Sequence, residues 1–156
     1  MKISETALPG LLVIDPAVHG DDRGFFLESW NGRRFAEVGI DADFTQDNHS
    51  RSVRHVLRGL HYQAGQHAQG KLVRATAGEV FDVVVDLRRS SPTFGRWHAE
   101  FQYKCTGRWN REAERTLAWN DPAVGVQWPL TAGLEPILSV KDRDHAASLA
   151  TCETFA

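Results

Sequence analysis

The chain has 156 residues, a length that predicts one domain spanning 1–156. Apolar residues make up 42% and charged residues 24%, which is the composition of an ordinary globular protein and excludes disordered and fibrous classes. The 18 Lys and Arg residues against 20 Asp and Glu give a formal charge of −2, so there is no net basic field for nucleic acid.

Short segments rich in β-branched and aromatic residues lie between turn signals. In chain order, strands are expected at 11–14, 24–30, 56–63, 72–76 and 80–87, and the last two form a hairpin around Gly78. One helix is expected between Asn31 as N-cap and Gly39 as C-cap. Residues 80–86 are nearly all apolar, which is typical of a strand buried on both faces. Many strands and few helices predict an all-β sandwich or barrel.

Several classes of protein lack support in the sequence. The longest aliphatic run is Val83–Val85, so we expect no membrane span, and the first ten residues lack the apolar stretch of a signal peptide. His55, His61 and His67 are six residues apart without the spacing of metal ligands, and no phosphate-loop, dinucleotide or serine-hydrolase motif occurs. The two cysteines match no ligand cluster. We expect a cytoplasmic protein with reduced thiols, no metal, and no nucleic-acid or membrane partner.

Polar side chains interrupt the strand-like segments. Arg58 and His61 lie in the segment VLRGLHYQ at 56–63, where strict alternation would place them on opposite faces. Gly59 permits a bulge that would bring both onto one face. Lys71, Gln46, Asn48 and Tyr103 also fall in or beside strands, a pattern that indicates a barrel interior holding a small polar ligand.

Nine segments together resemble one family, the dTDP-4-dehydrorhamnose 3,5-epimerases, which act in L-rhamnose biosynthesis. They occur in the family's order along nearly the whole chain. They are Asp22–Glu28, Gln46–Ser50, Val56–Gln63, Gln69–Val73, Gly78–Asp86, Ser91–Trp97, Tyr103–Thr106, Trp119–Pro122 and Leu138–Asp142. The resemblance implies an all-β cupin-type double-stranded β-helix (jelly roll) with few short helices, no cofactor, and a homodimer.

The resemblance also implies the roles of individual residues. His61 is expected to be the catalytic base with Asp142 as its carboxylate partner, Tyr103 the acid on the opposite face of the sugar, and Lys71 the cation facing the keto oxygen. Trp109 falls where the family stacks an aromatic ring on thymine. The remaining substrate contacts implied are Arg23, Glu28, Gln46, Asp47, Asn48, Arg58, Glu114 and Lys141.

The chain departs from the family between Trp97 and Tyr103. The family carries about two more strands there, with a histidine that contacts substrate, whereas this chain has only residues 98–102. This departure weakens the expectation of catalytic activity more than it weakens the resemblance to the family.

The residue types suit epimerisation of a 4-keto-6-deoxy sugar. The hydrogens on C3 and C5 are acidic because their removal gives an enolate. Histidine is a suitable base since its ordinary pKa is about 6.5, a carboxylate fixes its tautomer, and a lysine stabilises the developing oxyanion. The expected conversion is dTDP-4-keto-6-deoxy-D-glucose to dTDP-4-keto-L-rhamnose. The alternatives are a relative that inverts one carbon only, a dTDP-sugar binding protein without catalysis, and a structural dimerisation domain.

Overall fold

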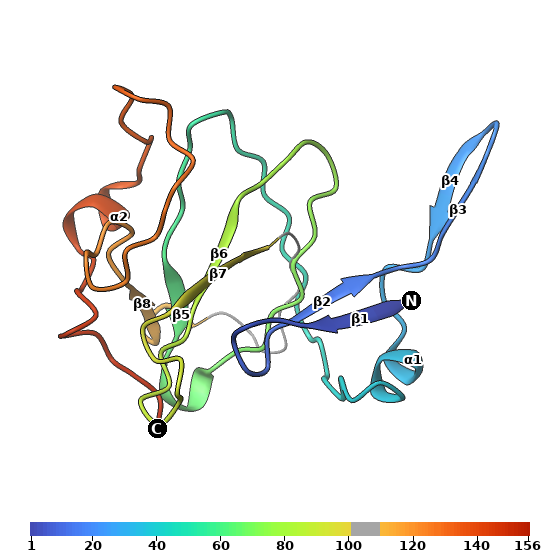
Figure 1. Cartoon of the computed structure of the whole chain (residues 1–156), viewed down its shortest axis with the longest axis horizontal. Helices are drawn as coiled ribbons and strands as arrows, with labels where there is room; N and C mark the ends of the chain where they lie inside the picture. Colours follow the sequence, from blue (N-terminus) through green and yellow to red (C-terminus); the bar gives the residue numbers. More distant parts are fainter. Residues whose placement is uncertain (101–109) are drawn as a thin grey trace. The chain divides into compact units, whose positions relative to one another are not determined.

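The computed structural model describes residues 1–100 and 110–156 (Figure 1). Two compact units make up the chain, Met1–Asp43 and Phe44–Ala156. The expectation of a single domain over 1–156 stays a prediction. No helix in the described ranges is long and apolar enough to cross a membrane.

The first unit contains two antiparallel strand pairs. β1 (Lys2–Glu5) pairs with β2 (Leu12–Asp15), and β3 (Val18–Asp21) pairs with β4 (Gly24–Leu27). Two residues join β3 to β4, and Gly24 follows them with φ +125°, a conformation that a side chain would disfavour. The strands expected at 11–14 and 24–30 are therefore present, the second with an earlier end.

The helix α1 (Gly32–Ala36) forms where the sequence places it. The Asn31 side chain accepts a hydrogen bond from the Arg34 backbone N–H, which is the N-cap interaction. At the other end Gly39 has φ +86°, and the N–H groups of Gly39 and Ile40 donate to Ala36 and Phe35. This pair of bonds satisfies helix carbonyls that have no partner within the helix.

The second unit is also built mainly from strands and loops. It contains β5 (His61–Gln63), the 3-10 turn η1 (Gly65–His67), β6 (Asp82–Val85), β7 (Trp97–Glu100), β8 (Glu114–Thr116) and the helix α2 (Val140–Asp144). β5 pairs with β8 and β6 with β7, both antiparallel. The described elements thus form an all-β fold with few short helices, as the sequence predicts.

Two predictions about the strands of this unit are wrong. The strand expected over 56–63 begins only at His61, because Gly59 has φ +120° and interrupts the extended backbone. The hairpin expected between 72–76 and 80–87 does not form within the described residues, since β6 pairs with β7 instead. Gly78 does adopt a turn conformation, with φ +72°.

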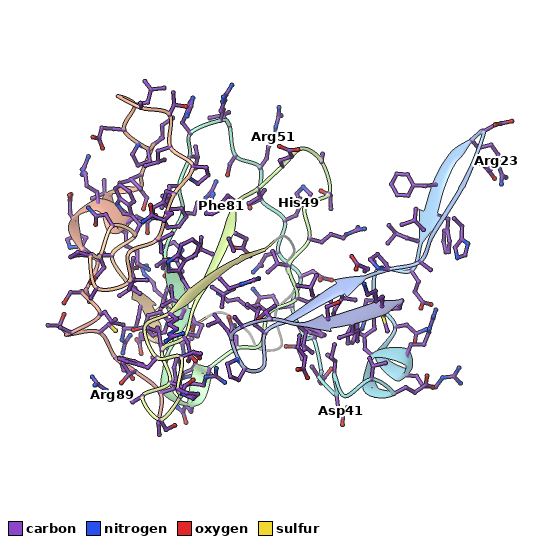
Figure 2. All side chains as sticks on the ribbon, in the orientation of Figure 1. Arg23, Asp41, His49, Arg51, Phe81 and Arg89 are labelled. Carbon is purple, nitrogen blue, oxygen red and sulfur yellow. The ribbon has the colours of Figure 1, made fainter. Side chains whose placement is uncertain are left out.

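The expectation that residues 80–86 are buried on both faces is also wrong. Val80 is 52% exposed, Phe81 37% and Val84 36%. Among the described strands β6 has β7 as its ladder partner, so the other edge of β6 is not covered by a described strand. Figure 2 labels Phe81, the residue that precedes β6.

The core of the second unit centres on Leu117, which is 1% exposed. Leu117 forms one buried cluster with Leu87, Val124 and Cys152. Tyr62 in β5 and Leu60, the residue before β5, pack against that cluster. These contacts bring the β5–β8 pair and the C-terminal segment onto one core.

Asp86 holds the loop that turns β7 back onto β6. Its buried carboxylate accepts hydrogen bonds from Arg88 Nε at 2.9 Å and Nη2 at 2.8 Å, from Ser91 Oγ at 2.5 Å and from Thr93 Oγ1 at 2.7 Å. The Arg88 guanidinium and these hydroxyls hold the pKa of the Asp86 carboxyl well below its usual range. This network favours the β6–β7 hairpin over one at Gly78, because Arg88, Ser91 and Thr93 in the loop gain a charged partner.

Substituting Asp86→Asn is expected to lower the free energy of unfolding by about 3 kcal/mol at pH 7, because it leaves Arg88 and two hydroxyls around a neutral amide. The lowered pKa means that the Asp86 contribution is present above about pH 4 and is lost as the pH falls further. Urea unfolding at pH 7 and pH 3 measures both effects. Asp144→Asn, which breaks the exposed pair with Arg143, is the control and is expected to change the stability little, because water screens that pair. Equal losses in the two variants would contradict the role of Asp86.

Candidate functional site

The sheet of β5 and β8 has two chemically different faces. In its register His61 lies opposite Thr116, Tyr62 opposite Arg115 and Gln63 opposite Glu114. Side chains alternate along a strand, so His61, Gln63, Glu114 and Thr116 share one face, which we call the site face. Tyr62 and Arg115 point the other way and bond to Glu153, the Tyr62 hydroxyl at 2.7 Å to its carbonyl and Arg115 Nε at 2.8 Å to its carboxylate.

A histidine and a carboxylate meet on the site face. His61 Nε2 lies 2.5 Å from Asp142 Oδ1, across 81 residues of sequence. The Asp142 side chain is 3% exposed and that of His61 32%. Ser139 Oγ donates to Asp142 Oδ2 at 2.9 Å and accepts from the Asp142 N–H at 3.1 Å. Both carboxylate oxygens are therefore engaged, and the His61 side chain remains partly exposed.

Two lysines lie beside this pair. Lys71 Nζ donates to the backbone carbonyl of His61 at 3.2 Å. Burial raises the pKa of the Asp82 carboxyl, and the positive charge of Lys71 opposes that rise. Lys141, which precedes Asp142 in the chain, has its Nζ 2.5 Å from Glu114 Oε2. The structure thus gathers five of the site residues expected from sequence, namely His61, Lys71, Glu114, Lys141 and Asp142.

Other expected contacts lie on the loops that lead into β5. The guanidinium of Arg58 is exposed and donates to Ser52 Oγ at 3.1 Å and to the Arg51 carbonyl at 3.4 Å. Arg58 is held by this loop, labelled at His49 and Arg51 in Figure 2, and none of its described hydrogen bonds reaches His61 or Asp142. Gln46 Nε2 donates to Asn48 Oδ1 at 3.0 Å, with the exposed Asp47 between them.

The remaining expected residues fall in the first unit or outside the description. Arg23 lies at the tip of the β3–β4 hairpin, where it pairs with Asp21 and lowers the pKa of that carboxyl (Figure 2). Glu28 accepts hydrogen bonds from Asn31 at 3.0 Å and Arg34 at 2.9 Å, which lower its pKa. Tyr103 and Trp109, the expected acid and the expected stacking ring, lie outside the described residues.

The sequence reasoning missed the helix α2 and its N-cap Ser139, although a signal was present. Ser139 and Asp142 have the Ser-x-x-acid spacing of a capping motif. It also missed Gln63, whose Oε1 accepts from the Asn110 N–H at 3.1 Å, and His67, whose Nε2 lies 3.2 Å from Asn110 Nδ2. These contacts fix the chain at residue 110, at the edge of the site face. In the ranges that the structure describes, no three His, Cys, Asp or Glu side chains are grouped to hold a metal ion.

Comparison with known proteins identifies the family of this chain. The family model described as dTDP-4-dehydrorhamnose 3,5-epimerase matches residues 5–100 and 98–150. The chain belongs to this family. A relative from Pseudomonas aeruginosa with that name is 50% identical over 94% of this chain and 96% of its own. One from Salmonella typhimurium is 44% identical over 91% and 92%.

Solved structures agree with the family assignment. A dTDP-6-deoxy-D-glucose-3,5-epimerase from Legionella pneumophila, crystallised with dTDP-4-keto-L-rhamnose, superposes with a TM-score of 0.90. It is 40% identical, and the match covers 97% of this chain and 94% of that one. The fold is therefore the all-β cupin-type jelly roll of these epimerases.

The comparisons also reveal a shortened segment. The two matches to the family model meet at residues 98–100. The Pseudomonas alignment spans 176 positions but covers 94% of 156 residues, or about 147, so about 29 aligned positions have no counterpart here. The division of the family match places this shortening at the end of β7, beside the strand whose apolar residues are exposed.

Replacing Ser139 by Ala is expected to lower the free energy of unfolding by about 1 kcal/mol, because it removes the N-cap of α2 and one of the two partners of the Asp142 carboxylate. Thermal unfolding followed by circular dichroism measures the change. Ser148→Ala, on the exposed surface beside Thr151, is the matched control and is expected to be nearly neutral. The same melting temperature for both variants would show that the cap does not stabilise α2.

Proposed function

We propose that this chain epimerises dTDP-4-keto-6-deoxy-D-glucose at C3 and C5 to give dTDP-4-keto-L-rhamnose in the cytoplasm. The observation that carries the proposal is the contact between His61 Nε2 and Asp142 Oδ1 at 2.5 Å, with Lys71 beside it, in a chain of the epimerase family. Relatives with this name match nearly the whole chain, which supports the same reaction class.

His61 would remove the proton next to the keto group. Asp142 holds Nε2, which leaves Nδ1 for the substrate, and the buried carboxylate stabilises the imidazolium that forms. Lys71 brings a positive charge to the same residue, where it would stabilise the enolate oxygen. Tyr103 would return a proton from the opposite face of the sugar. Each step moves one proton, so the reaction needs no net oxidation or reduction.

The nucleotide would be held by residues away from the dyad. Arg58, on the loop before β5, presents a forked cation of the kind that pairs with a diphosphate. Trp109 would stack on the thymine. The other proposed contacts are Arg23, Glu28, Gln46, Asp47, Asn48, Glu114 and Lys141. Binding of these remote parts would position the sugar against His61.

His61→Asn is expected to abolish deuterium incorporation at C3 and C5 when the substrate is incubated in heavy water, because the base is lost. Binding of dTDP is expected to stay within about twofold, since the nucleotide does not need the base. Nuclear magnetic resonance of the sugar measures exchange, and calorimetric titration measures binding. His145→Asn, an exposed histidine that caps α2, is the control and should exchange normally. Wild-type exchange in His61→Asn would remove His61 from the mechanism.

A second candidate function is favoured by the shortening near residues 98–100. A chain that lacks about 29 family positions there could retain nucleotide binding without catalysis. The same heavy-water experiment on the unmodified protein separates the two functions, because a binding protein incorporates no label. Label at one carbon alone would identify a mono-epimerase.

We further propose that the chain acts as a homodimer through the β3–β4 hairpin. Phe25 is 74% exposed, Phe26 71% and Val18 58%, although large apolar side chains on a strand pair normally pack against another layer. A second copy of the chain would bury them. Arg23, at the tip of the same hairpin, could then reach the site of the neighbouring subunit.

Light scattering is expected to give the mass of a dimer for the native protein. The double substitution Phe25→Ser and Phe26→Ser is expected to shift the protein to monomer at micromolar concentration, because the buried apolar area is lost. Val38→Ser, at an exposed apolar position in the turn that follows α1, should leave the mass unchanged. A native monomer that still turns over substrate would contradict the dimer proposal.

A further inference from the structure

One buried polar side chain on the site face has no hydrogen-bond partner among the residues that the structure describes. Thr116 lies opposite His61 in the β5–β8 register and is 5% exposed. Its hydroxyl oxygen is buried and has no hydrogen-bond partner in the described structure. A buried hydroxyl without a partner destabilises the folded protein, so such groups are few and call for an explanation.

The strand geometry places this hydroxyl beside the proposed base. The backbones of Leu60 and Leu117 exchange both hydrogen bonds, at 3.1 and 2.9 Å. The next pair, His61 and Thr116, is therefore the non-hydrogen-bonded kind, in which the two backbones come closest and the side chains lie next to each other on one face. The His61 side chain is 32% exposed, so Thr116 lies deeper on the same face than the ring.

Nothing in the packing of the strand requires a hydroxyl at this position. Valine has the same shape and an equal preference for strands, and it would avoid the cost of the unpartnered oxygen. The Asp142 carboxylate beside His61 is already bonded to the ring and to Ser139, and the Lys141 ammonium is paired with Glu114. The Thr116 oxygen is thus a buried polar atom of the site face for which the described residues supply no partner.

We propose that Thr116 is a sugar-binding residue whose hydroxyl bonds to an oxygen of the substrate's hexose ring. The inference rests on the proposed function, because a sugar whose C–H bonds reach His61 presents its ring oxygens and hydroxyls to the side chain next to His61. The hydroxyl can both donate and accept, so it suits a sugar hydroxyl. Thr116 would then discriminate the sugar, while the nucleotide is bound elsewhere.

Calorimetric titration of two ligands into four proteins, the native protein and three variants, tests the proposal. Thr116→Val is expected to bind dTDP-glucose about tenfold more weakly than the native protein, which is the loss of one hydrogen bond, and to bind dTDP with unchanged affinity. Thr116→Ser keeps the hydroxyl and should bind both ligands within about twofold of the native protein. Thr151→Val, at an exposed threonine, is the matched control for the substitution itself.

Thermal unfolding of the same proteins separates this role from a structural one. Thr116→Val is expected to melt at the same temperature as the native protein or higher, because it removes an unpartnered buried hydroxyl. Equal affinity of Thr116→Val and the native protein for dTDP-glucose would overturn the proposal, as would a loss of dTDP affinity together with a lower melting temperature. Because binding is measured without turnover, a native protein that fails to exchange deuterium would overturn the proposed reaction and not this assignment.

Discussion

The pairing of β5 with β8 is the constraint on which the site depends. Leu60 and Leu117 exchange two backbone hydrogen bonds, and Leu117 is buried at the centre of the core. A shift of one residue in this register would turn His61 toward the core and Tyr62 toward α2, because side chains alternate between the faces. Burial of Leu117 therefore determines the face on which the histidine lies. Strands as short as β5 and β8 keep this register because the apolar residues next to them, Leu60 and Leu117, are held in the core.

The site combines buried and exposed charge. Asp142 is almost fully buried, and a carboxylate in that position is tolerated only when its oxygens have partners. His61 and Ser139 supply them, one from β5 and one from the N-cap position of α2. The charges of Lys71 and Lys141 lie farther out, where water screens them, so holding them beside the pair costs little stability. The helix α2 is short, and the contact between Asp142 and His61 joins it to β5.

The shortening beside β7 has a visible counterpart in β6. Three apolar side chains, Val80, Phe81 and Val84, are more than a third exposed on a segment whose composition is that of an interior strand. The family match breaks at residues 98–100, in the strand that pairs with β6. The local sequence has kept the pattern of a buried strand, while the chain that follows β7 is about 29 positions shorter than in the Pseudomonas relative.

The sequence by itself determined the all-β class, the helix capped by Asn31, and the family, because these depend on local propensity and on motifs that keep their order along the chain. It also singled out His61 and Asp142, which lie 81 residues apart, but only through the resemblance. Tertiary structure decided the partner of β6, since the local sequence offers a turn at Gly78 as well as one at the Asp86 loop. It alone placed Ser139 against Asp142 and Thr116 beside His61. A register between strands 50 residues apart is set by burial of Leu117 in the shared core, and that energy exists only when the whole unit is folded.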